Sequence, residues 1–148
     1  MPRLRAAHTG DANRIRALLE HDGLPTSDLA SSTPEFVVAC EGDEVIGAGA
    51  LERFGTTALL RSLVVNCERR DAGVGQSIVG ELERRARAAG VKELVLLTQT
   101  AASFFEREGY RVVERGSVPH AVQMSEEFRS LCPASATCMA KALESSSG

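Results

Sequence analysis

The spacing of apolar and polar residues along this chain predicts an alternation of strands and helices. Apolar residues at intervals of three and four, as in residues 73–89, occupy one face of a helix. Short runs rich in Val, Leu and Ala are typical of buried strands. The predicted strands span residues 4–7, 35–40, 44–53, 58–66, 93–98, 110–114 and 137–143, and the predicted helices span residues 12–19, 73–89, 101–108 and 126–131.

These elements predict a single α/β domain. We place it at residues 1–144, followed by a frayed polar tail at residues 145–148. The net charge of −3 provides no basic field for nucleic acid. No apolar run approaches the roughly 18 residues that a membrane span requires. We therefore expect a soluble, cytoplasmic protein with no nucleic-acid or membrane partner.

The four cysteines are Cys40, Cys67, Cys132 and Cys138. No two form a C-x-x-C pair, and no histidine lies at the spacing of a metal finger. The sequence predicts free thiols and no metal site.

The stretch that carries chemistry is a strand, a tight loop and a helix. The strand ends at Leu63, Val64 and Val65, and the helix begins near Gly73. A helix start has backbone N–H groups without partners and a partial positive charge. Glycines there let the backbone approach an anion closely. The stretch predicts a pyrophosphate site, and the alternative is a glycine-rich turn that only caps the helix.

Two other phosphate-binding motifs are excluded by the residues that follow. A P-loop requires Lys and then Ser or Thr after its glycines, whereas Gly75 is followed by Gln76 and Ser77. A dinucleotide fingerprint requires a third glycine at position 78, which is Ile78.

Two motifs together resemble the GNAT acetyltransferase superfamily. The first is Arg-x-x-Gly-x-Gly at Arg70, Gly73 and Gly75; the second is aromatic-x-x-x-Gly-aromatic from Phe105 to Tyr110. The order of elements over residues 4–113 is also similar. The resemblance implies an α/β (α+β) fold, with a mixed central sheet of about six or seven strands flanked by about four helices.

The resemblance implies acetyl-CoA as co-substrate. The strand ending at Leu63-Val64-Val65 would splay from the strand at residues 94–98, and the pantetheine arm would lie between them. Backbone N–H groups of residues 71–76 would hold the pyrophosphate. The implied cofactor-binding residues are Leu63, Val64, Val65, Arg70, Asp71, Ala72, Gly73, Val74, Gly75, Gln76, Ser103 and Phe104.

The chain departs from the family at both positions of acid–base chemistry. Many relatives have a tyrosine acid in the short helix, where this chain has Phe105, and a glutamate base where it has Leu59. We assign Tyr110 to the core. The base candidates are Glu52, whose alternative is an exposed strand residue, and then His120, whose alternative is a loop residue.

Arg61 is an unusual charge in an apolar strand. Alternation places it on the same face as Leu59 and Leu63. It either clamps a substrate carboxylate in a fork or forms a structural ion pair with Glu52 or Glu44. Arg53, Thr98 and Gln99 are further candidates for substrate binding.

Three segments resemble one branch of the family: residues 60–65, 96–100 and 131–136. This branch includes small acetyltransferases of arsenic-resistance loci and the catalytic domain of N-acetylglutamate synthase. It implies a small acceptor, an acidic amino acid or an analogue such as an organoarsenical. Open alternatives are a non-catalytic acyl-CoA-binding module and arsenical binding by Cys132 and Cys138. GNAT proteins often pair into homodimers.

Overall fold

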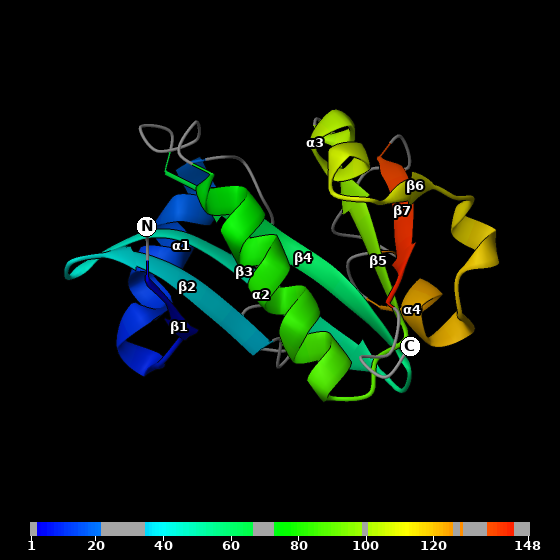
Figure 1. Cartoon of the computed structure of the whole chain (residues 1–148), viewed down its shortest axis with the longest axis horizontal. Coiled ribbons are helices and arrows are strands. Elements are labelled where there is room, and N and C mark those ends of the chain that lie inside the picture. The colour runs from blue at the N-terminus through cyan, green and yellow to red at the C-terminus, as the bar shows by residue number, and fades with distance from the viewer. Residues whose placement is uncertain are drawn as a thin grey trace.

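The computed structural model describes residues 3–21, 35–66, 73–98, 101–125, 128 and 136–143. Its elements follow the predicted order closely (Figure 1). The strands are β1 Arg3–Ala6, β2 Glu35–Glu41, β3 Glu44–Phe54, β4 Thr57–Val65, β5 Glu93–Thr98, β6 Arg111–Val112 and β7 Thr137–Ala142; the helices are α1 Ala12–His21, α2 Val74–Ala88, α3 Ala102–Arg107 and α4 His120–Gln123, with short 3-10 turns at Thr9–Asp11 and Arg115–Ser117.

The strands form one seven-stranded mixed sheet in the order β1-β2-β3-β4-β5-β7-β6. Among the described strands, only β4 and β5 pair in parallel, and the other neighbours are antiparallel. The predicted fold class is therefore confirmed. No helix in the described part of the chain has the length and apolar character needed to cross a membrane.

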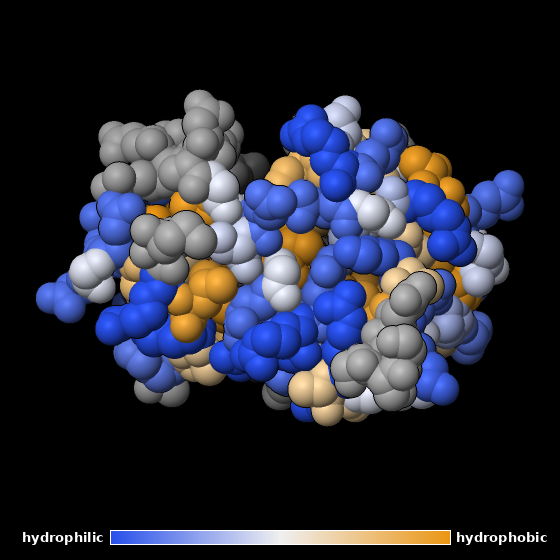
Figure 2. Space-filling view, viewed as in Figure 1, coloured by the Kyte–Doolittle hydropathy of each residue, from blue (hydrophilic) through white to orange (hydrophobic). Residues whose placement is uncertain are grey.

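Apolar side chains cover both faces of this sheet. The helix α2 crosses β3 and β4 on one face, and its outer surface is mainly hydrophilic (Figures 1 and 2). On the other face, α1 packs against β2–β4 and α4 packs against β4 and β5. The core on the α2 face includes Leu60, Ile78, Leu82, Leu94 and Met139; the α1 cluster includes Ile15, Leu18, Val38, Ala48 and Val64; and the α4 cluster includes Leu59, Val95, Val118 and Val122.

The parallel pair β4 and β5 is joined over a short length. Its ladder runs from Thr57–Glu93 to Leu59–Val95, whereas β5 continues beside β7 as far as Thr98. Beyond the ladder the two strands diverge (Figure 1). This is the splay that the family resemblance implied.

A bulge interrupts β4 just beyond this point. Ala48 pairs with Val64 and Ala50 pairs with Arg61, so that Gly49 lies opposite two residues, Ser62 and Leu63. Ser62 has a positive φ of 58°, which is uncommon for a residue with a side chain.

The bulge corrects our prediction that Leu63 shares a face with Arg61. One inserted residue reverses the alternation of side chains. Leu63 packs on the α2 face, whereas Arg61 lies opposite Ala50 on the other face, as Leu59 does opposite Glu52.

Two glycines of β3 bring α2 close to the sheet. A Cβ on Gly47 would lie 2.9 Å from Ile78 Cδ1, and a Cβ on Gly49 would lie 2.8 Å from Ile78 Cγ2 and 3.0 Å from Leu82 Cδ1. No side chain fits at either position without displacing the helix or its side chains. The sheet and the start of α2 therefore lie at a spacing that only glycine permits.

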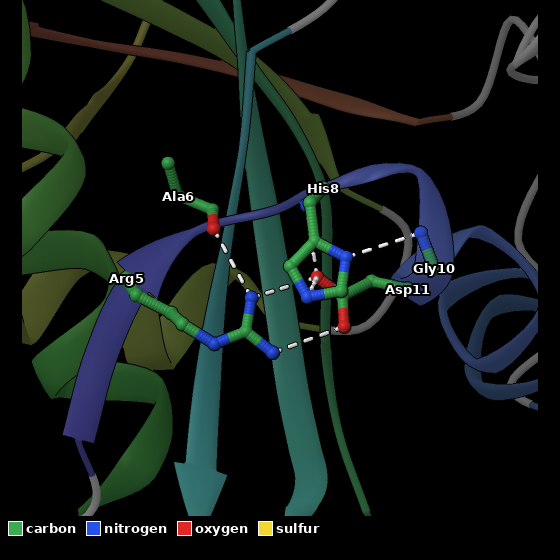
Figure 3. A network of polar contacts seen from close by, with 5 residues as sticks. All are labelled: Arg5, Ala6, His8, Gly10 and Asp11. Atoms are coloured by element: carbon green, nitrogen blue, oxygen red, sulfur yellow. Dashed lines mark hydrogen bonds and ion pairs between the residues drawn. The ribbon is translucent and has the colours of Figure 1, made fainter.

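A polar network connects β1 to α1 (Figure 3). The guanidinium of Arg5 donates to both carboxylate oxygens of Asp11, at 2.7 and 3.0 Å, and the His8 N–H donates to Asp11 at 2.9 Å. The hydrogen bond from Arg5 is the main reason that the pKa of the buried Asp11 falls to about 2. This network fixes the turn before the helix.

Three other features of the structure differ from what the sequence pattern suggests. The strand at residues 110–114 is shorter, because Tyr110 turns into the core and Glu114 precedes a 3-10 turn. His120 begins the helix α4 and is not a loop residue. Glu83, which the helical pattern places on the polar face of α2, is buried. Of the predicted helix at residues 126–131, only Phe128 lies within the described residues.

Candidate active site

The start of α2 has the geometry of an anion cradle. Gly73 caps the helix in the left-handed conformation, with φ 75° and ψ 13°, and a Cβ there would meet nothing within 4 Å. The Ser77 N–H donates to the Gly73 carbonyl at 3.0 Å, as the first hydrogen bond of the helix. The N–H groups of residues 74–76 precede that bond and point out of the helix start. A positive helix end behind an open surface suits a phosphate group.

Three predicted cofactor segments meet at Gly75. A Cβ on Gly75 would lie 3.6 Å from Phe104 Cζ and 3.7 Å from Val65 Cγ2. The ring of Phe104 packs edge to face on Phe105, with centroids 5.1 Å apart. The end of β4, the start of α2 and α3 therefore come together. Apolar atoms also show between the hydrophilic surfaces of α2 and α3 (Figure 2).

The backbone of β4 turns polar groups toward the splay. The Asn66 N–H donates to the Ile46 carbonyl of β3 at 2.7 Å. Because N–H and C=O groups alternate in direction along a strand, those of Val65 point away from β3. They face the side where β5 has diverged, which is where an extended ligand could add hydrogen bonds.

The other predicted cofactor residues differ in their burial, and some lie outside the described residues. The side chains of Val64 and Val74 pack in the core on opposite faces. The Val74 N–H lies at the helix start, whereas alternation turns the backbone groups of Val64 toward β3. Ser103 is an exposed residue of α3. Arg70, Asp71 and Ala72 lie outside the described residues, as does the substrate candidate Gln99.

Arg61 and Glu52 form an ion pair on the face of the sheet opposite α2. Arg61 Nη1 lies 3.1 Å from Glu52 Oε1. The side chain of Arg61 is 1% exposed and that of Glu52 is 21% exposed. The ion-pair alternative for Arg61 is thus present in the structure, and Glu52 is the member that reaches solvent. Arg61 is the second residue beyond the β4–β5 ladder, so the pair lies beside the splay.

The other substrate candidates occupy different surroundings. Arg53 pairs with Glu35 at the surface, and its partner across the sheet is Ala58, on the α2 face. It is therefore not on the face of Arg61. The Thr98 hydroxyl accepts a hydrogen bond from the Ala101 N–H at 3.0 Å, just before α3 begins.

The departures from the family's acid and base positions are real in the structure. Leu59 is fully buried, and Phe105 is buried against Tyr110. Tyr110 is a core residue, as expected, and its hydroxyl donates to Glu83 at 3.0 Å. Burial raises the pKa of Tyr110 well above its ordinary value. His120 is exposed at the start of α4.

The structure describes only one of the two cysteines considered for arsenical binding. Cys138 is buried in β7, and burial raises the pKa of its thiol, which disfavours the thiolate that binds an arsenical. Cys132 lies outside the described residues.

The sequence analysis did not identify Ser62, Gly47 or Gly49, which shape this site through the backbone. No feature of the sequence indicates that Ser62 adopts the left-handed backbone conformation. Gly47 and Gly49, two apart in a strand, do carry a signal, since glycine inside a strand often marks a close approach of another element.

Comparison with known proteins decides the family. The Acetyltransferase (GNAT) domain matches residues 32–112, which is more than half of the chain and includes the β4–α2 connection. The chain belongs to the GNAT acetyltransferase family. As a GNAT acetyltransferase it is an acetyl-CoA-dependent N-acetyltransferase.

Sequence identity to the individual relatives is modest. This GNAT acetyltransferase is 30% identical over 105 residues to the uncharacterized N-acetyltransferase YjcF of Bacillus subtilis, covering 67% of this chain and 75% of the relative. It is 25% identical over 125 residues to an amino-acid acetyltransferase of Neisseria meningitidis, covering 78% of this chain and 29% of that protein.

Solved structures show the same fold. N-acetylglutamate synthase from Neisseria gonorrhoeae, complexed with coenzyme A and N-acetyl-glutamate, superposes with a TM-score of 0.84 at 21% identity, covering 97% of this chain and 35% of that one. A Mycobacterium tuberculosis protein in complex with coenzyme A gives a TM-score of 0.79 at 24% identity, covering 97% of this chain and all of that one. The chain spans about a third of the length of both Neisseria proteins.

Proposed function

We propose that this GNAT acetyltransferase acetylates the α-amino group of a small acidic amino acid or a close analogue. The observation that carries the proposal is the Arg61–Glu52 pair beside the splay. An amino acid is a zwitterion, and the pair offers a guanidinium for its carboxylate and a carboxylate for its ammonium group. The amino-acid acetyltransferases among the relatives support the same acceptor class.

The cofactor half of the site follows from the backbone. Acetyl-CoA supplies the activated thioester. The N–H groups of residues 71–76 and the charge of Arg70 hold the pyrophosphate, and Ser103 and Phe104 flank the arm. The Val65 N–H, turned toward the splay, polarises the thioester carbonyl as an oxyanion-hole donor.

Glu52 is the proposed base. The acceptor ammonium must lose a proton before its nitrogen can attack, and a carboxylate removes it directly or through one water. Glu52→Gln should lower kcat by about 10²-fold or more, because general base catalysis contributes that much. Raising the pH should restore part of the rate, since the free amine then forms without a base. A variant with unchanged kcat at neutral pH would remove Glu52 from this role.

Arg61 is the proposed carboxylate-binding residue, with Thr98 and Gln99 as further contacts. Arg61→Ala should raise the KM for the acceptor sharply and leave coenzyme A binding almost intact. Arg53→Ala serves as the matched control on the other face of the sheet, where no rise in this KM is expected. Loss of coenzyme A affinity in Arg61→Ala would contradict the assignment.

The acceptor class is tested by thiol release. Purified protein is mixed with acetyl-CoA and a panel of amino acids: acidic ones, their amides, neutral ones of similar size, and an organoarsenical analogue. The proposal expects the highest kcat/KM with acidic acceptors or the analogue. Equal rates for acidic acceptors and their amides, or no thiol release despite firm coenzyme A binding, would refute it.

A further inference from the structure

The splay divides the molecule into two parts that need to be held at a fixed angle. The N-terminal half-sheet consists of β1–β4 with α2 packed on it, and the C-terminal half-sheet consists of β5, β7 and β6 with α3 packed on β7. Within the part of the chain that the structure describes, only the ladder from Thr57–Glu93 to Leu59–Val95 joins their strands. A short hydrogen-bonded joint leaves the angle between the halves to side-chain contacts.

A buried charged cluster spans this joint. Glu83 of α2 accepts hydrogen bonds from Lys141 of β7, at 3.1 Å to each carboxylate oxygen, and from the Tyr110 hydroxyl at 3.0 Å. Lys141 also donates to the Glu108 carbonyl, at the end of α3, at 2.8 Å. We name Glu83, Lys141 and Tyr110 the bridge. It connects α2 of one half to β7 and α3 of the other.

The bridge is closely confined. The side chain of Glu83 is 9% exposed and that of Lys141 is 23% exposed. Lys141 Nζ lies 5.5 Å from the centroid of the Tyr110 ring. The backbone passes so near that a Cβ on Gly109 would lie 3.2 Å from Lys141 Cε. Charged hydrogen bonds in such a site have a defined geometry, whereas the apolar contacts around them are not directional.

The position of the bridge gives it control over the opening. Lys141 pairs with Leu94, and Leu94 pairs with Ala58 in the short ladder, so the bridge lies level with the closed end of the splay. The open end is where Gly75 of α2 approaches Phe104 of α3. A restraint between the same two helices at the closed end therefore sets their spacing at the open end.

We infer that Lys141, with Glu83 and Tyr110, is a positioning group for coenzyme A, because it sets the distance between the start of α2 and α3. This inference rests on the cofactor half of the proposed function and not on the identity of the acceptor. The bridge touches no ligand and acts through the two helices that do.

The test compares variants by calorimetry with free coenzyme A, together with Tm and steady-state kinetics. Lys141→Met should raise the Kd for coenzyme A by about tenfold, since small misplacements of binding groups have effects of this size or larger. The KM for acetyl-CoA should rise in parallel, and the KM for the acceptor should stay constant. Lys141→Arg, which keeps the charge and its donors, should stay near the wild-type Kd.

Two controls separate positioning from stability. Glu83→Gln combined with Lys141→Met removes both charges and leaves an acceptor for Tyr110, so it should fold well and still bind coenzyme A weakly. Asp11→Asn breaks an ion pair within the N-terminal half-sheet, so it should lower Tm and leave the Kd unchanged. Wild-type affinity in both Lys141→Met and the double variant would overturn the inference alone. Failure of the wild type to bind coenzyme A would overturn the cofactor site as well.

Discussion

The substitution Gly49→Ala tests whether α2 is held at a spacing that only glycine permits. In an open strand position, the change would stabilise the protein by about 0.5–1 kcal/mol, because glycine loses more backbone entropy on folding. Here the new Cβ would lie 2.8 Å from Ile78 Cγ2, 3.0 Å from Leu82 Cδ1 and 3.3 Å from Leu63 Cδ1. Ile78 and Leu82 are fully buried, so neither can swing into solvent.

The expected cost is that of overpacking a core, about 1–3 kcal/mol. For a domain of this size, each kcal/mol corresponds to about 2–4 °C in Tm. We expect urea unfolding to give a lower midpoint with an unchanged slope. Gly80→Ala is the matched control, because a Cβ on that glycine of α2 would meet nothing within 4 Å. It should stabilise by up to about 1 kcal/mol through helix propensity.

A double-mutant cycle sharpens the test. Ile78→Val removes Cδ1, the atom nearest a Cβ on Gly47, and keeps Cγ2, the atom nearest a Cβ on Gly49. The cycle should therefore show a favourable coupling between Ile78→Val and Gly47→Ala and little between Ile78→Val and Gly49→Ala. Gly49→Ala with a wild-type or higher midpoint would refute the reasoning. Equal couplings in the two cycles would refute the assignment of the contacts.

Three further predictions concern other positions. Gly73→Val should weaken coenzyme A binding in calorimetry, because a β-branched residue resists a φ of 75° at the cradle; unchanged affinity would contradict the cradle. Asp11→Asn should lower Tm at pH 7 by about 3–12 °C, the size expected for a charged hydrogen bond. The folded pKa of Asp11 is about 2 against an ordinary 3.8, so its contribution is full above pH 4 and disappears as the pH falls toward 2. Thermal melts of the wild type and variant should converge over that interval and in no other. Ser62→Val should cost about 1–2 kcal/mol in urea unfolding, because its φ is 58°; Ser62→Gly should cost less.

Local patterns were sufficient to predict most of the architecture. Helical spacing located α2 within one residue at each end, since a long amphipathic helix repeats its signal over four turns. The apolar run at residues 58–66 predicted β4, and the helical pattern from Gly73 onward predicted the start of α2. By contrast, α4 has only four residues, too few for a period to show.

The features that sequence could not supply are those that depend on distant partners. Glu83 is a charged residue of a helix. It is buried because Lys141 and Tyr110, which are distant in the sequence, form hydrogen bonds with it. For Arg61 the sequence left a substrate clamp and an ion pair open, and the structure shows the ion pair, since a buried guanidinium requires a partner. The bulge at Ser62 results from pairing with β3, and a single strand read by itself gives no sign of it.

That bulge has a practical consequence for redesign. Upstream of Ser62, Leu59 and Arg61 project from the same side of the sheet as Glu52, and downstream of it Leu63 and Val65 project from the reverse side. One continuous strand thus exposes two independently variable sets of positions. Libraries that diversify the first set test the proposed acceptor site and leave Leu63 and Val65 unchanged. Deleting Ser62 should remove the bulge and keep both sets on their present sides, because Gly49 would then lie opposite Leu63 alone.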